Sequence, residues 1–142
     1  MKPVIFLRIA SVLTLIHAVL HTIGGVFGKP APGLQEATVL VMKTNQFPLM
    51  GHTRSFWDFY IGMGLAVSIF LTVEALAFWL LGSLAKSHAR ELRPLLATFA
   101  VGYLALVVNS YEFFFSGPVI AEIVIVLCLG MAIVTAKPSH AS

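Results

Sequence analysis

Four long apolar segments constrain the fold of this chain more than any other feature of its sequence. They extend over residues 4–27, 56–81, 94–115 and 118–136, and few charged residues interrupt them. At about 1.5 Å per helical residue, each is long enough to cross a hydrocarbon core of about 30 Å. Lipid offers no hydrogen bonds to the backbone, so each segment is expected to be helical. The sequence therefore predicts an all-α integral membrane protein, a single four-helix bundle over residues 1–142.

The composition excludes a soluble domain of this size. Of the 142 residues, 58% are hydrophobic and 11% are charged, whereas soluble domains have about 45–50% and about 25%. So few charges cannot cover the surface of a small folded domain, and the same numbers exclude a disordered chain. The single cysteine, Cys128, excludes an internal disulfide and is expected to be a small buried hydrophobe. No basic stripe or binding motif is present, so no nucleic-acid partner is expected.

The connecting segments predict how the helices are joined. A tight reversal at residues 116–118 is expected to make the third and fourth helices an antiparallel hairpin. The longest connection, residues 28–55, is expected to lie outside the membrane. Its middle, residues 34–47, fits either a short helix in the membrane interface or a loop packed over the bundle.

Basic residues are more frequent on the side that holds both termini and the second connection than on the other side. They are Lys2, Arg8, Lys86, Arg90, Arg93 and Lys137 on the first side, against Lys29, Lys43 and Arg54 on the second. This bias predicts a multi-pass protein of the cell inner membrane with both termini in the cytoplasm. The first segment also resembles a signal peptide. Its length, its two histidines and the lack of a small-x-small cleavage site favour a retained span.

Polar side chains inside the spans are the candidate functional residues, because an ionisable group there costs roughly 2.5–3.5 kcal/mol. Counting along each helix predicts which of them lie at a similar depth. Seven fall in the outer half of the bundle and come from all four helices or the adjoining loop: His17, His21, His52, Asp58, Asn109, Glu112 and Glu122. The first two histidines share one helix face, because they are four residues apart. The sequence therefore predicts a polar pocket in the outer half of the bundle.

Other polar and aromatic residues lie apart from this group. Glu74 lies toward the cytoplasmic end of the second span, where it is expected to reach the interface or to pair with Arg8 or Arg93. Tyr103 lies near mid-membrane, and its hydroxyl must find a hydrogen-bond partner. The two tryptophans of the chain lie near opposite ends of the second span, as expected of interfacial anchors.

Each member of the group also has a structural interpretation that the sequence leaves open. The histidines and Asn109 fit interhelical hydrogen bonds as well as they fit a ligand site. Asp58 is typical of an acid in the first turn of a helix, with Ser55 as the cap. Glu112 and Glu122 fit protonated partners that hold the last two helices together. Two pairs of small residues indicate close helix packing, Gly62/Ala66 and Gly64/Ser68.

The polar pocket supports several functional hypotheses. The leading one is binding of a small amphipathic ligand, a quinone or a lipid, with a role in redox or proton transfer left open. A haem or metal site on His17 and His21 is an alternative, since histidines at i and i+4 can both ligate a metal. An enzyme acting on lipid would use histidine and carboxylate as acid and base, but no nucleophile motif is present.

A further alternative is a non-catalytic subunit or assembly partner of a membrane complex, or a homo-oligomer, in which the polar groups are structural. The cofactor thus stays open among haem, quinone and metal, and membrane lipid is the expected partner. Whether the protein is an enzyme is left open.

The first two spans resemble a known group of proteins. The pattern is His17-x-x-x-His21-x-x-Gly24-Gly25, then Met42, then Gly51-x-x-Arg54-Ser55-Phe56-Trp57-Asp58-Phe59-Tyr60-x-Gly62. It resembles small four-span bacterial membrane proteins of uncharacterised function. The resemblance covers most of the chain. It implies the four-span topology and implies no activity.

Overall fold

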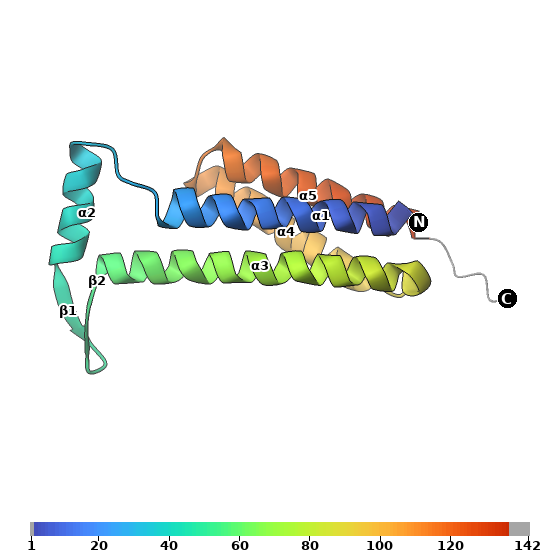
Figure 1. Cartoon of the computed structure of the whole chain (residues 1–142), viewed down its shortest axis with the longest axis horizontal. Helices are drawn as coiled ribbons and strands as arrows, with labels where there is room; N and C mark the ends of the chain where they lie inside the picture. Colours follow the sequence, from blue (N-terminus) through green and yellow to red (C-terminus); the bar gives the residue numbers. More distant parts are fainter. Residues whose placement is uncertain (1, 137–142) are drawn as a thin grey trace. The chain divides into compact units, whose positions relative to one another are not determined.

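The computed structural model describes residues 2–136, which are mostly helical (Figure 1). Four helical segments of this part are long and apolar enough to cross a membrane. They are α1 (Lys2–Leu20) with the π-helical turn η1 (His21–Val26), α3 (Phe56–His88), α4 (Arg93–Phe113) and α5 (Ser116–Thr135). The prediction of four apolar helices is confirmed. Lys137, which entered the charge comparison, lies outside the described residues.

The long connection between the first two spans is structured. It contains the helix α2 (Leu34–Thr44) and the antiparallel strands β1 (Gln46–Leu49) and β2 (His52–Ser55). Of the two alternatives for this segment, the short helix is therefore the one present. The two-stranded hairpin corrects the all-α prediction, and Figure 1 shows it between α2 and α3.

The hairpin is held by its turn and by one aromatic side chain. Met50 and Gly51 both have positive φ, 48° and 82°, as a two-residue type I′ turn requires. The Phe47 ring lies 5.0 Å from the Phe56 ring and stacks on the Phe59 ring at 6.0 Å between centroids. The hairpin is thereby anchored on the first turn of α3.

The chain divides into two compact units. Unit 1 is Met1–His17 with Leu71–Ser142, and unit 2 is Ala18–Phe70, so α1 and α3 contribute residues to both. In unit 1, segments of α1, α3, α4 and α5 share one core, which is the expected four-helix packing. Its buried members are Leu7, Ala10, Phe78, Leu81, Ala85, Leu96, Tyr103, Ile125, Cys128, Leu129 and Ala132. The cysteine is thus a small buried hydrophobe, as predicted.

Two helix boundaries differ from the sequence-based expectation. α4 and α5 do pack on one another, but residues 114 and 115 make the connection, and residues 116–118 form the first turn of α5. Pro118 is tolerated there because the first turn of a helix lacks intrahelical partners for its N–H groups. α3 continues past residue 81 to His88, so the helix is longer than the apolar segment that predicted it.

The small residues of α3 in unit 2 lie on two different sides of the helix. A Cβ atom on Gly64 would lie 2.9 Å from the Cγ2 atom of Val26, so α3 packs closely on η1 here. A Cβ atom on Gly62 would meet nothing within 4 Å. Two residues along a helix correspond to about 200°, so the two glycines face opposite ways. The predicted close packing holds for the Gly64/Ser68 pair and does not hold at Gly62.

We expect Gly64→Ala to lower the free energy of unfolding by about 1–2 kcal/mol, because overpacking against a stiff β-branched side chain exceeds the gain in helix propensity. Gly62→Ala makes the same chemical change on the same helix in open space. It should be neutral or stabilise the protein by up to about 1 kcal/mol. Reversible unfolding of both variants in detergent measures the difference. Equal effects of the two substitutions would contradict this packing.

Candidate functional site

A capping box joins the hairpin to α3. The backbone N–H and the hydroxyl of Ser55 both donate to Oδ2 of Asp58, at 2.7 and 3.0 Å, and the Asp58 N–H donates to the Ser55 Oγ at 3.2 Å. This reciprocal pairing satisfies N–H groups that a helix start leaves without partners. Asp58 therefore has the structural role that its position in the first turn suggested. Its other oxygen, Oδ1, takes no part in the cap.

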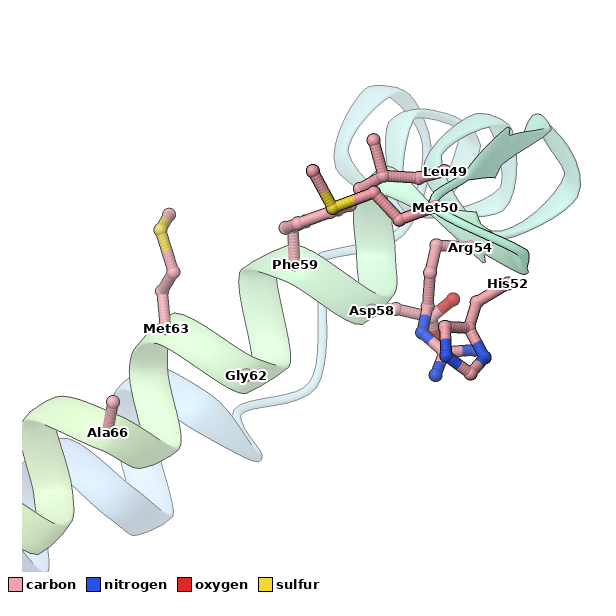
Figure 2. A pocket seen from close by; sticks show the side chains of 9 residues that line it. All are labelled: Leu49, Met50, His52, Arg54, Asp58, Phe59, Gly62, Met63 and Ala66. Atoms are coloured by element: carbon pink, nitrogen blue, oxygen red, sulfur yellow. The ribbon is translucent and has the colours of Figure 1, made fainter.

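A hollow of about 470 Å³ lies between the hairpin and the beginning of α3. Three polar side chains line it at the hairpin end: His52 and Arg54 of β2 and Asp58 of α3 (Figure 2). All three are exposed. The structure thus brings together two of the predicted site residues. It adds Arg54, which was not among the predicted site residues.

The rest of this hollow is an apolar trough. Phe59, Gly62, Met63 and Ala66 follow one another down one side of α3 in Figure 2, at the i, i+3, i+4, i+7 spacing of a single helix face. The floor is low at Gly62 and Ala66, because these residues carry little or no side chain. Leu49 and Met50 of the hairpin complete the apolar lining. The hollow therefore has a polar end that continues into an apolar trough.

A second hollow in unit 2, of about 450 Å³, lies beside η1. Its lining includes the backbone of Gly24 and Gly25, residues of α2, and the side chains of Trp57 and Tyr60. The Tyr60 hydroxyl donates to the carbonyl oxygen of Gly25 at 2.9 Å, and its ring stacks on Trp57 at 5.2 Å. The Lys43 ammonium lies 4.6 Å from the Trp57 ring centroid, a cation–π contact. These contacts tie α2 and η1 to the first turns of α3.

His21 begins the π-helical turn and contacts α3. Its Nδ1 lies 3.0 Å from the Ser68 Oγ, which also accepts a hydrogen bond from the Thr22 hydroxyl at 2.8 Å. This is the interhelical hydrogen bond that the sequence left open as a structural role for the histidine. The π turn brings two consecutive polar residues to the same serine. No feature of the sequence predicted this π-helical turn. Such turns are frequent at functional sites.

In unit 1, Glu122 is the most deeply buried member of the predicted group, with 4% of its surface exposed. The Ser110 hydroxyl donates to its Oε1 at 2.9 Å, across the α4–α5 hairpin. Oε2 is buried with no hydrogen-bond partner among residues 2–136. Asn109 and Glu112 are exposed on α4. The hydrogen-bond partner of Glu122 is therefore a serine. Ser110, rather than a second carboxyl group, joins α4 to α5 here.

Glu74 and Tyr103 pair with each other inside unit 1. The Tyr103 hydroxyl donates to Oε2 of Glu74 at 2.9 Å, and the Thr14 Oγ1 lies 3.4 Å from the same hydroxyl. Tyr103 is 1% exposed, so its hydroxyl has found the partner that its depth required. The expectation that Glu74 pairs with Arg8 or Arg93 is not met.

Arg8 contacts α3 at another position along unit 1. Its guanidinium donates to the Ser83 Oγ at 2.8 Å and lies 3.5 Å from the centroid of the Trp79 ring. Gly82 makes room for this side chain, since a Cβ atom there would come within 3.3 Å of Nε. Ser83 is more than two turns along α3 from Glu74, which explains why the arginine does not reach that carboxyl group.

The seven predicted site residues are thus divided between the two units. His52 and Asp58 share one hollow of unit 2, and His21 belongs to the same unit. The half-buried His17 and the three polar residues of α4 and α5 belong to unit 1. Among residues 2–136, no group of three or more His, Cys, Asp or Glu side chains could hold a metal ion. A site on His17 and His21 stays a prediction from the sequence.

Comparisons with protein-family models, with curated proteins and with solved structures find no match to this chain. The resemblance to small four-span membrane proteins rests on the motif residues of the first two spans.

Proposed function

We propose that this protein is an inner-membrane protein that binds a small amphipathic molecule, a quinone or a lipid, between the β1–β2 hairpin and the start of α3. The observation that carries the proposal is the form of the hollow. Three polar side chains converge at one end, and an apolar trough continues from them along α3. Sites for small ligands have this general form, with a few polar groups that orient a ligand and apolar surface that holds it.

The dimensions of α3 support a ligand that comes from the bilayer. The helix has 33 residues, which corresponds to about 50 Å, whereas a hydrocarbon core is about 30 Å thick. One or both ends of α3 therefore extend beyond the hydrocarbon. The polar hairpin end belongs in the interface, and the trough leads from there toward the hydrocarbon. An amphipathic molecule in the bilayer already has this orientation, so it can enter without turning over.

The helix α2 supports the placement of this end of unit 2 at a membrane surface. Leu34, Leu40 and Val41 are 84%, 61% and 57% exposed, although α2 also carries Glu36 and Lys43. A helix with an exposed apolar face and a charged face is typical of the membrane interface. With both termini in the cytoplasm, as the basic residues predict, α2 and the hairpin face the outer leaflet.

We expect Gly62→Leu to weaken ligand binding at least roughly tenfold, because the new side chain fills the floor of the trough and displaces ligand methylene groups. A Cβ atom at this position meets nothing within 4 Å, so the substitution should not disturb the fold. The measurement is titration of the detergent-solubilised full chain with a short-chain phospholipid and with a short-chain quinone, followed by native mass spectrometry.

Gly102→Leu is the matched control. It makes the same change on α4, where a Cβ atom also meets nothing within 4 Å. Its binding should equal that of the unchanged protein. If Gly62→Leu and the control bind both probes as well as the unchanged chain does, the trough is not the binding site and the proposal is wrong.

The orientation is tested by labelling with a membrane-impermeant maleimide, on a Cys128→Ala background that removes the only native thiol. We expect Glu36→Cys, in α2, to react in spheroplasts with an intact inner membrane. Ser87→Cys, near the end of α3, should react only after that membrane is opened. Both positions are exposed in the structure. The reverse pattern would place the termini on the outer side.

A further inference from the structure

The polar end of the hairpin hollow presents two opposite charges. Arg54 and Asp58 both line it, and both are exposed. The two hydrogen bonds that the Asp58 carboxylate accepts in the capping box both go to Oδ2, which leaves Oδ1 available to a ligand. A carboxylate oxygen at this position accepts hydrogen bonds and attracts a cationic group.

Arg54 supplies the complementary charge. One of its nitrogens, Nη1, donates to the neighbouring Thr53 carbonyl oxygen at 2.9 Å, and the rest of the guanidinium remains to donate to a ligand. Its forked donors match the oxygens of a phosphate group. His52, two residues earlier on β2, adds a ring nitrogen at the same end of the hollow (Figure 2). The capping box already occupies the start of α3, so recognition of an anion falls to these two side chains.

These charges discriminate among amphipathic molecules. The carbonyl oxygens of a neutral quinone head can accept hydrogen bonds from Arg54, but an oxidised quinone has no N–H or O–H group to donate to the Asp58 carboxylate. A headgroup with only negative charge would match Arg54 and be repelled by Asp58. A headgroup with a phosphate and an ammonium group matches both side chains, one charge each.

We propose that the hollow binds a zwitterionic phospholipid whose headgroup ends in a primary ammonium group, as in phosphatidylethanolamine. The phosphate lies against Arg54 and His52, the ammonium donates to Oδ1 of Asp58, and an acyl chain follows the trough past Gly62. This inference rests on the proposed function and names its ligand. A primary ammonium donates hydrogen bonds to a carboxylate, whereas the trimethylammonium of phosphatidylcholine has no N–H to donate.

The test is competition among three phospholipids with identical acyl chains, phosphatidylethanolamine, phosphatidylcholine and phosphatidylglycerol, for the detergent-solubilised full chain. Native mass spectrometry reads the bound lipid from its mass. We expect phosphatidylethanolamine to be preferred roughly tenfold over each of the others, the size expected for one charge-assisted hydrogen bond.

Two substitutions separate the two halves of the headgroup site. Asp58→Asn should abolish the preference over phosphatidylglycerol while lipid binding persists. The Asn side-chain oxygen still accepts the Ser55 N–H, so the start of α3 is kept. Arg54→Gln should weaken the binding of all three lipids, because each carries a phosphate. Glu112→Gln and Arg90→Gln, which neutralise exposed charges elsewhere in the chain, are the matched controls and should retain the preference.

The possible failures are distinguishable. One outcome is that all three lipids bind equally well and Gly62→Leu weakens the binding of each. The hollow would then bind lipid without recognising the ammonium group, and only this inference would be overturned. A preference for phosphatidylglycerol, or one that survives Asp58→Asn, also overturns it. If Gly62→Leu leaves all binding unchanged, the proposed function fails as well.

Discussion

The three hydrogen bonds between Ser55 and Asp58 fix the point where the hairpin ends and α3 begins. They satisfy two of the N–H groups that the start of the helix leaves without intrahelical partners. They set the rotation of the first turn, which brings Phe56 and Phe59 to the Phe47 ring of the hairpin. They also use a single oxygen of Asp58. The same contacts therefore build the hollow and leave a charged atom for its polar end.

From this start, the small residues of α3 in unit 2 divide the helix into two sides. Gly64 and Ser68 face η1, where Val26 packs closely and Ser68 is hydrogen-bonded to His21 and Thr22 of the π turn. Gly62 and Ala66, two residues earlier in each case, form the floor of the trough. The sequence shows the same spacing for both pairs. One pair packs the protein, and the other leaves space that a ligand chain can occupy.

Length and hydropathy were sufficient to predict the four apolar helices. A long apolar segment in lipid must satisfy its own backbone hydrogen bonds, and a helix does so. The hairpin was missed because Met50–Gly51 is not a typical type I′ turn sequence. Counting residues gave the depth of each polar group but not its rotation about the helix axis. It therefore grouped the exposed Glu112 with the buried Glu122 and could not find the partnership of Glu74 with Tyr103. Such partnerships depend on which helices are neighbours, and the sequence pattern does not contain that information.

Both proposals depend on the trough along α3, where we propose that a lipid chain lies. The most direct measurement is photocrosslinking of the full chain in bilayer nanodiscs with a phosphatidylethanolamine that carries a diazirine in its acyl chain. Mass spectrometry of the peptides then locates the adducts. We expect adducts concentrated at Phe59, Met63 and Ala66 and reduced by an excess of unlabelled lipid. Adducts as frequent at the exposed Leu104 and Val108 of α4 as in the trough would contradict this proposal.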